Sequence, residues 1–294
     1  MKWPILAVSL LATFTALIPP RCDALSLRLL ETIGPDLGSA RLVGPFGVST
    51  AASGDILVSD DLGNRVYHFD ESRTLVRALG EQLGFSYTDA ALLVPSGYIV
   101  ADTGRHRLLF LSAGGEVERS ISRLGWFSKL ANPRSVSKNA DGSLLVADWG
   151  NNRVVRISPD GTLIARYAGE LSRPIDAIEV PSLGVVVSDH RNDRLRVFPS
   201  DGSPARTIGS HGRGSGQLNR PCGLALGPKG FLWVADSRNA RLSVFAPSGA
   251  PHATISGAPG TRLSRPTDLA FDRDGRIWVS DAGEHKVYLF EVEP

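Results

Sequence analysis

An aspartate and a basic residue recur six times along the chain, always five positions apart. Six carboxylates arranged in a ring could bind metal ions or act as general acids and bases. A feature that is present in every repeat is more often structural, because an aspartate closes a turn through its side chain and pairs with a nearby base. We therefore assign both columns to the scaffold. They are Asp60, Asp102, Asp148, Asp189, Asp236 and Asp281, each in a Val-[Ser/Ala]-Asp tripeptide, with Arg65, Arg107, Arg153, Arg194, Arg241 and Lys286.

The positions beside these invariant columns differ between repeats, so they are better candidates for a site. The residues that directly follow the aspartates are Asp61, Thr103, Trp149, His190, Ser237 and Ala282. Fifteen positions before each aspartate stands a second column, with proline in every copy except the second, which has Tyr87. The residues that follow this column are Phe46, Thr88, Arg134, Ile175, Cys222 and Thr267. A shared structural role would make these two sets uniform, and they are not.

From these sets we select Asp61, Arg134, Trp149, His190 and Cys222 as a candidate ligand-binding site. An arginine fork can hold a carboxylate or phosphate, an indole ring can stack on a ligand, and an imidazole can transfer a proton. The alternative is an ordinary solvated rim with one partly buried thiol. A nucleophilic Cys222 paired with His190 is disfavoured, because no third group that would orient the histidine is apparent. We predict no catalytic residue.

The sequence does not predict a metal site. Zinc sites need three or four convergent ligands, and no pair of the six histidines has a short metal-type spacing. The chain also lacks a nucleophile elbow, a phosphate loop and an HExxH run. We expect no cofactor, with zinc or calcium left open as an alternative. The histidines are His68, His106, His190, His211, His252 and His285.

The charge of the chain is nearly balanced, with 32 Lys and Arg against 30 Asp and Glu. This balance argues against a general nucleic-acid binder, which usually carries a strong basic excess. One segment, 190–220, is locally basic. A solvated surface is its default interpretation, and docking of an anionic surface is the alternative. Its six arginines are Arg191, Arg194, Arg196, Arg206, Arg213 and Arg220.

Each repeat has the pattern of four short strands. In the fifth copy we predict strands at 223–226, 231–235, 241–245 and 251–255, separated by turns rich in Gly and Pro. The repeated aspartates are 41 to 47 residues apart, and no stretch shows a sustained helical period. Four strands in each such period are typical of a propeller blade. We predict an all-β fold, a six-bladed propeller over residues 25–294.

The two ends of the repeat array indicate how the ring closes. The sixth repeat ends after its third strand, 286–290, and residues 27–34 resemble the fourth strands at 164–169 and 205–209. We therefore predict that the N-terminal strand completes the last blade, which would remove an exposed sheet edge.

Residues 1–24 have the pattern of a signal peptide. Lys2 precedes an uncharged stretch at 5–18, and Cys22 and Ala24 occupy the -3 and -1 positions of a cleavage site. The stretch is shorter than the roughly 20 apolar residues of a transmembrane helix. We predict cleavage after Ala24, a secreted or periplasmic protein and no stable membrane insertion. A retained anchor is the alternative.

Three segments of the chain resemble the NHL repeat. They are 102–108, 148–154 and 209–226, the last with Gly212, Gly214, Gly216 and Pro221 at the family's positions. The resemblance extends over residues 25–294 and implies a six-bladed propeller of NHL type. Propellers of this family include RNA-binding modules, protein-interaction platforms, extracellular sensors and the amidating-lyase fold, so the resemblance does not decide the function. The histidines of an amidating lyase have no residue-by-residue match here, and the rim columns lack the Glu of a lactonase metal cage.

The sequence thus predicts an exported, non-enzymatic binding or protein-interaction module. It would use the face that carries the variable loops, among them 123–132 and 209–220. The expected partner is a protein or an anionic or glycan ligand, and not a nucleic acid. The alternative is a metal-assisted lyase or hydrolase, similar to the amidating lyase or to a lactonase. Its site would lie at the mouth of the central channel, which both variable sets should rim.

Overall fold

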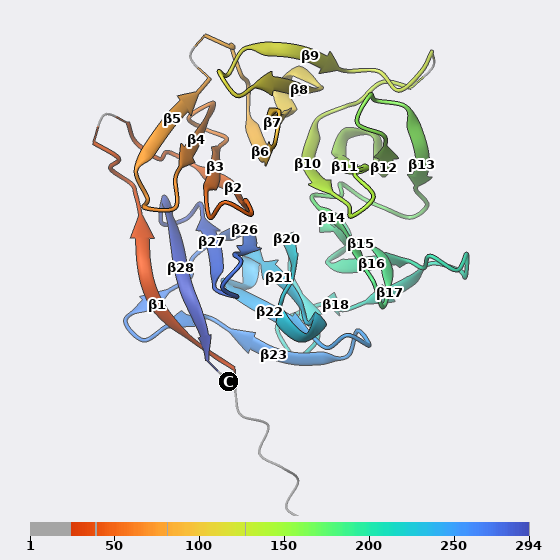
Figure 1. The fold of residues 1–294 in the computed structure, drawn as a ribbon. Coiled ribbons are helices and arrows are strands. Elements are labelled where there is room, and N and C mark those ends of the chain that lie inside the picture. Colours follow the sequence, from red (N-terminus) through yellow and green to blue (C-terminus); the bar gives the residue numbers. More distant parts are fainter. Residues whose placement is uncertain (1–24, 39, 81, 127, 294) are drawn as a thin grey trace, which may run out of the picture.

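The computed structural model describes residues 25–38, 40–80, 82–126 and 128–293. Its strands form six four-stranded antiparallel sheets, which stand side by side in a ring (Figure 1). This arrangement is the predicted six-bladed propeller. The predicted signal peptide, residues 1–24, lies outside the described residues, so export stays a prediction. In the described part of the chain, no helix is long and apolar enough to span a membrane.

The four strands of each blade follow one another from the central channel to the outer edge. Blade 1 holds, in this order, β2 (Pro45–Thr50), β3 (Ile56–Asp60), β4 (Arg65–Phe69) and β5 (Leu75–Leu79), and blade 2 holds β6 (Thr88–Val94), β7 (Gly97–Asp102), β8 (Arg107–Ser112) and β9 (Val117–Ile121). Blade 3 holds β10 (Pro133–Lys138), β11 (Leu144–Asp148), β12 (Arg153–Ile157) and β13 (Leu163–Tyr167), and blade 4 holds β14 (Ala177–Val180), β15 (Gly184–Asp189), β16 (Arg194–Phe198) and β17 (Arg206–Ile208). Blade 5 holds β20 (Pro221–Leu226), β21 (Leu232–Asp236), β22 (Arg241–Phe245) and β23 (Pro251–Ile255), and blade 6 holds β26 (Pro266–Phe271), β27 (Ile277–Asp281), β28 (Lys286–Glu293) and β1 (Ser26–Ile33).

The remaining elements are short and lie in the connections. Single 3-10 turns follow the second strand of four blades: η1 (Thr103–Arg105), η2 (Trp149–Asn151), η3 (His190–Asn192) and η5 (Ser237–Asn239). A fifth, η4 (Pro228–Gly230), joins β20 to β21. Two-residue strands pair in the loops after blades 4 and 5: β18 (Ser210–His211) with β19 (Gln217–Leu218), and β24 (Gly257–Ala258) with β25 (Thr261–Arg262).

The N-terminal strand closes the ring, as predicted. β1 pairs antiparallel with β28 from Ser26 opposite Glu293 to Ile33 opposite Val287, and the two strands run together in Figure 1. Leu27 and Ile33 point into the core, where their side chains are 1% and 7% exposed. The last blade therefore takes its outer strand from the other end of the chain.

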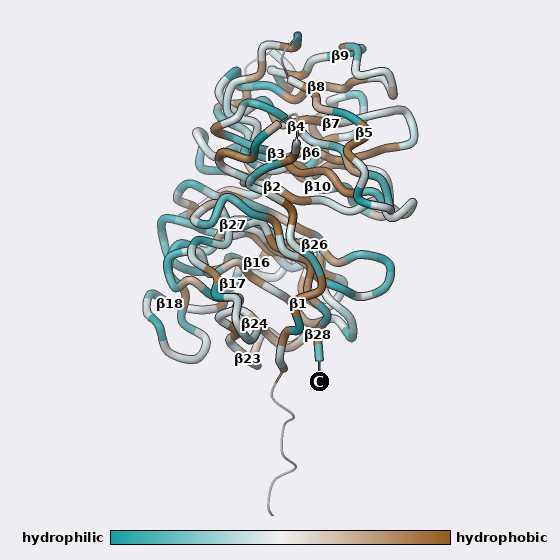
Figure 2. Tube along the Cα trace, turned by 90° about the vertical axis from the view of Figure 1, so that its left-hand side faces the viewer, coloured by the Kyte–Doolittle hydropathy of each residue, from teal (hydrophilic) through white to brown (hydrophobic). Residues whose placement is uncertain are grey.

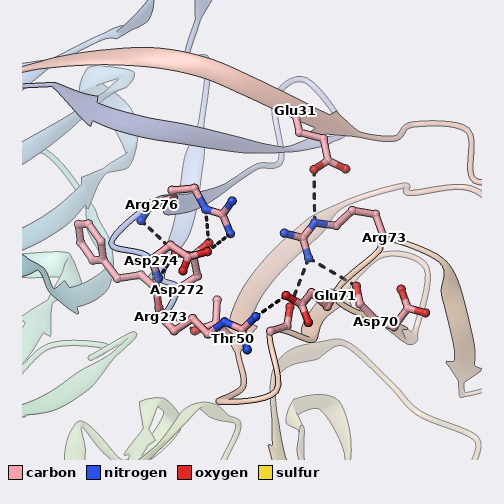
Figure 3. A network of polar contacts seen from close by, with 11 residues as sticks. Glu31, Thr50, Asp70, Glu71, Arg73, Asp272, Arg273, Asp274 and Arg276 are labelled. Carbon is pink, nitrogen blue, oxygen red and sulfur yellow. Dashed lines mark hydrogen bonds and ion pairs between the residues drawn. The ribbon is translucent and has the colours of Figure 1, made fainter.

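A polar network links this closing strand to blade 1 (Figure 3). Arg73, in the turn between β4 and β5, donates from Nε to Glu31 Oε2 on β1 at 3.3 Å, and its guanidinium lies 4.7 Å from the ring centre of Trp278 on β27. Arg273, in the turn between β26 and β27, pairs with Glu71 of blade 1. These contacts join blades 1 and 6 by side chains in addition to the β1–β28 ladder.

The apolar residues of the repeat pack between neighbouring blades. In β3, β11, β21 and β27 every residue is buried. This burial explains why the repeat has valine followed by a small residue, since both faces of the second strand meet another sheet. Figure 2 shows the result, with apolar residues along the strands and polar residues in many of the loops.

The repeated aspartates have the scaffold role that we assigned to them. Asp60 Oδ2 and Oδ1 accept the backbone N–H groups of Val43 and Gly44 at 2.8 and 2.6 Å. In four blades the base five positions later donates from Nε to the same carboxylate, at 2.6–2.8 Å. These pairs are Asp102 with Arg107, Asp148 with Arg153, Asp189 with Arg194 and Asp236 with Arg241.

Candidate functional site

The first strand of each blade begins, and the second ends, at the same end of the ring. The variable positions of the repeat are therefore brought to one face. On this face lies a cavity of about 420 Å³. A second cavity, of about 110 Å³, lies between the inner strands of all six blades, so the first cavity is the mouth of the central channel. Its lining is Phe46, Asp61, Leu62, Arg134, Trp149, Ile175, His190, Arg191, Arg220, Cys222, Ser237, Arg238, Arg265, Thr267 and Ala282.

The structure brings all five selected residues, Asp61, Arg134, Trp149, His190 and Cys222, into this one cavity. They come from four blades and lie far apart in the sequence. Their convergence follows from the propeller geometry, because each stands where a first strand begins or a second strand ends. That they bind a ligand stays a prediction.

Blade 2 departs from the predicted alignment by one residue. Thr88 pairs with Asp102 in the same way that Pro45 pairs with Asp60 in blade 1. The prediction that Thr88 and Thr103 rim the mouth is wrong, since both are buried and neither is among the lining residues. For Thr88 the physical reason is a shorter turn between the first two strands, since only two residues separate Val94 from its ladder partner Gly97. The turn does not affect Thr103, which is buried against blade 3, where its hydroxyl donates to the carbonyl oxygen of Pro133 at 2.6 Å.

The consequence of this shift is that Asp89 has the strand position in blade 2 that Arg134 has in blade 3, directly after the residue that pairs with the repeated aspartate, but Asp89 is buried and is not among the lining residues of the cavity. Arg134 Nε lies 3.4 Å from Asp89 Oδ2, and the Asp89 side chain is fully buried. Two other buried aspartates at the inner strands behave differently. Asp176 accepts the N–H of Leu224 and Asp268 accepts that of Val48, each from the next blade. Asp89 is therefore a buried partner of the cavity residue Arg134, and no prediction from the sequence included it.

Arg134 is the central side chain of the mouth. Its guanidinium carbon lies 5.1 Å from the ring centre of Phe46 and 5.3 Å from that of Trp149. Trp149 also has Arg173 over its ring at 3.9 Å. The Arg134 side chain is 24% exposed, so its charge is partly removed from water but still open to a ligand.

The two carboxyls nearest to Arg134 resist ionisation. Burial raises the pKa of Asp89 to about 7, against the attraction of Arg134, which lowers it. Burial also raises the pKa of Asp61, again opposed by Arg134. The desolvation of each carboxylate thus outweighs its attraction to the arginine.

The histidine and the thiol of the cavity are both neutral near pH 7. His190 Nδ1 donates to the carbonyl oxygen of Pro221 at 3.0 Å, and burial lowers the pKa of His190 to about 4. Burial raises the pKa of Cys222 to about 12, and its sulfur lies 3.6 Å from His190 Nδ1. A thiolate–imidazolium nucleophile is therefore not formed in this arrangement.

Arginines dominate the rest of the lining. Arg191, Arg220 and Arg238 have no side-chain hydrogen bond or ion pair to any described residue, and Arg265 has only the carbonyl oxygen of Ala282 at 3.4 Å. Arg191 and Arg220 belong to the basic segment of the sequence, whereas no prediction included Arg238 and Arg265. The available signal was position: Arg220 and Arg265 directly precede the proline column, and Arg191 and Arg238 stand two places after the repeated aspartate.

The cavity offers few metal ligands. Of its lining, only Asp61, His190 and Cys222 carry side chains that commonly bind metals, and the described residues contain no group of three His, Cys, Asp or Glu placed to hold an ion. The other histidines make local contacts: His68, for example, lies between Tyr98 and Asp55. The zinc or calcium alternative thus has no assembled donor set in the described part of the chain.

Asp89→Asn should change how stability depends on pH. The carboxyl has its pKa raised from 3.8 to about 7 on folding, so its favourable contribution is complete below about pH 4 and is lost as the pH rises through 7. Asparagine imitates the neutral acid and does not titrate. We expect equal stability near pH 4 and a more stable variant at pH 8, by about 1.4 kcal/mol for each unit of the shift at most.

Urea unfolding at pH 4, 6 and 8 measures this difference. Glu118→Gln, which removes an exposed carboxylate on β9, is the matched control and should leave the profile of the parent protein unchanged. A variant of Asp89 with the parent's stability at all three pH values would show that folding does not desolvate the Asp89 carboxyl.

Comparison with known proteins supports the fold. The NHL repeat family matches residues 218–245, which include the first three strands of blade 5. A streptogramin B lyase structure is 14% identical with a TM-score of 0.63, covering 92% of this chain and 98% of that one. The virginiamycin B lyase of Staphylococcus aureus is 14% identical with a TM-score of 0.64, covering 92% and 88%.

A structure described as a putative gluconolactonase is 18% identical with a TM-score of 0.67, covering 92% of this chain and 93% of that one. No curated protein matches the sequence. At these identities the structural likeness establishes the fold and not the activity. The chain is therefore a six-bladed β-propeller with an NHL repeat in its fifth blade.

Proposed function

We propose that this protein is a binding module that holds an anionic ligand at the mouth of its central channel. The observation that carries the proposal is the charge of the cavity lining: five arginines stand against one carboxylate, Asp61. Three of these guanidinium groups have no partner among the described residues. The ligand would supply the missing negative charge.

The physical argument is that like charges gathered in a concave site raise its potential and attract counter-ions. An arginine donates from a fixed fork that fits a carboxylate or a phosphate in a bidentate manner. Arg134 and Arg220 are only partly exposed, so their attraction for an anion is less screened than at an open surface. These properties favour binding of an anion over binding of a neutral or cationic molecule.

The cavity also has apolar lining on the side of blades 1 and 3. Phe46 and Trp149 present rings there, and Leu62, which is 52% exposed, lies beside them in the lining. On the same face, Tyr87 is 53% and Trp126 is 89% exposed. An anionic group joined to an aromatic or other apolar body fits this combination, whether it belongs to a small molecule or to a partner protein.

The alternative, a metal-assisted lyase or hydrolase, draws on the fold shared with the streptogramin B lyase and the gluconolactonase-like protein. The binding function is favoured because His190 and Cys222 do not form an activated base and nucleophile: His190 Nδ1 and the Cys222 thiol are both bonded to backbone carbonyls. Metal uptake by the purified protein distinguishes the binding function from the enzyme. Stoichiometric uptake of zinc or calcium with a large rise in melting temperature would support the enzyme.

Isothermal titration calorimetry with phenyl phosphate and benzoate tests the binding function. We expect saturable binding that weakens as the salt concentration rises, because the interaction is between charges. Trp149→Leu should weaken the binding of both aromatic probes about five- to tenfold, which is the size of a lost stacking contact. The matched control is Trp126→Leu, since Trp126 is exposed and is not among the cavity's lining residues. Failure of both phenyl phosphate and benzoate to bind would refute the proposal.

A further inference from the structure

The charges and rings of the cavity are separated into two halves. Blades 4 to 6 and the loops that enter them contribute four guanidinium groups, Arg191, Arg220, Arg238 and Arg265. Blades 1 and 3 contribute the aromatic rings of Phe46 and Trp149. Arg134 of blade 3 lies close to both rings, so a ligand in the cavity meets four guanidinium groups on one side and, on the other, two aromatic rings with a fifth guanidinium between them.

Three of the arginines act on the same point at the centre of the mouth. Arg134 and Arg220 both oppose protonation of His190, while Arg134 and Arg265 both favour ionisation of Cys222. His190 and Cys222 are themselves in contact, with 3.6 Å between Nδ1 and the sulfur. Arg134, Arg220 and Arg265, which come from blades 3, 5 and 6, thus line the cavity near the contact between His190 and Cys222.

The carboxylates close to this volume do not balance the arginines. Asp61 and Asp89 both interact with Arg134, but of the two only Asp61 lines the cavity, against five arginines. Asp193 is occupied by other groups, since it accepts the backbone N–H of Arg220 at 2.7 Å and pairs with His211 at 2.9 Å. The side chains of Arg191, Arg220 and Arg238 remain without partners among the described residues.

We propose that the ligand carries two negative charges at one end, held by the arginines of blades 4 to 6, and an aromatic body that rests on Trp149. This proposal rests on the anion-binding function proposed above and specifies its ligand class. A single carboxylate occupies one arginine fork and leaves the other guanidinium groups unpaired. An aryl phosphate or an aromatic dicarboxylate supplies enough oxygens and charge for several forks at once.

The test compares four probes by calorimetry at pH 8, where a phosphate monoester is a dianion because its second pKa is about 6. Phenyl phosphate and benzene-1,3-dicarboxylate have two charges and a ring, benzoate has one charge and a ring, and methyl phosphate has two charges without a ring. We expect at least one aromatic dianion to bind ten or more times tighter than benzoate. The tighter of the two identifies phosphate or dicarboxylate as the recognised group.

Variants assign this preference to the two halves of the cavity. Arg220→Gln combined with Arg265→Gln should remove most of the advantage of the dianions over benzoate. Trp149→Leu should weaken phenyl phosphate and leave methyl phosphate unchanged. Arg276→Gln is the matched control, because Arg276 pairs with Asp272 and Asp274 in a turn at the other end of the blade 6 strands.

The outcomes separate this inference from the function on which it rests. Equal affinity for benzoate and the aromatic dianions would overturn the dianion proposal and leave anion binding intact. A dianion preference that survives in the Arg220 and Arg265 double variant would overturn the assignment of the charged end to blades 5 and 6. Failure of all four probes to bind would overturn both proposals.

Discussion

Replacing Arg134 with glutamine is expected to weaken the binding of phenyl phosphate about 100-fold. Arg134 stands between the rings of Phe46 and Trp149 and is the positive charge nearest to Asp89. Its loss removes one charged hydrogen-bonding fork that lies between the two aromatic rings of the cavity. Truncating one member of a partly buried charge pair typically costs about 2–5 kcal/mol, and 100-fold lies within this range.

The variant should remain folded, so that the loss can be assigned to binding. Asp89 can take up a proton when the arginine is gone, because burial already favours its neutral form. Arg134→Lys is the informative companion: it keeps the charge without the fork, and we expect it to lose about tenfold. Calorimetric titration and a melting curve of each variant measure the two effects. A glutamine variant that binds phenyl phosphate as the parent does would remove Arg134 from the site.

The fold was predictable from the sequence because its signal is repeated. Val-[Ser/Ala]-Asp recurs in six copies, and each copy places the same buried strand end and the same turn-closing carboxylate. An error in one copy is corrected by the others. The closing strand β1 was also predictable, because residues 27–34 resemble the sequences of two other outer strands, at 164–169 and 205–209.

The site was only partly predictable, because it depends on how the copies differ. The positions that follow the repeated proline and aspartate identified Arg134 and Trp149. An alignment of the repeats by fixed spacing fails, however, where a turn in one copy is shorter. In blade 2 a turn shorter by one residue puts Asp89, and not Thr88, at the strand position that corresponds to Arg134. A register change of one residue reverses which face of a strand a side chain occupies, and only the ladder reveals it.

The rim arginines were missed for a different reason. Arg238 and Arg265 are exposed residues in turns, and nothing in their immediate sequence distinguishes them from solvated surface. Their importance comes from what surrounds them: they share a cavity with Arg134 and Arg220, although Arg134 lies more than a hundred positions before both of them in the sequence. These arginines are brought together in one cavity only when the blades have formed the closed ring.

Deleting residues 25–34 in the full chain is expected to lower the melting temperature by about 10 °C or more. The deletion removes β1 and with it the side chains of Leu27 and Ile33, which are 1% and 7% exposed. Burial of two such side chains contributes about 3–6 kcal/mol. In a domain of about this size each kcal/mol shifts the melting temperature by about 2–4 °C. The ion pair of Glu31 with Arg73 is lost as well.

The deletion should also make the protein aggregate, since it leaves β28 as an edge with unpaired backbone groups. Two point variants on β1 separate burial from the mere presence of the strand. Leu27→Asn should reproduce much of the loss, whereas Arg28→Gln, which changes an exposed side chain paired with Glu291 and Glu293, should shift the melting temperature by no more than about 1–2 °C. Differential scanning calorimetry measures all three variants. If the deleted protein melts at the temperature of the parent, the ring does not depend on its N-terminal strand, and the residues of the cavity are held together by the remaining strands alone.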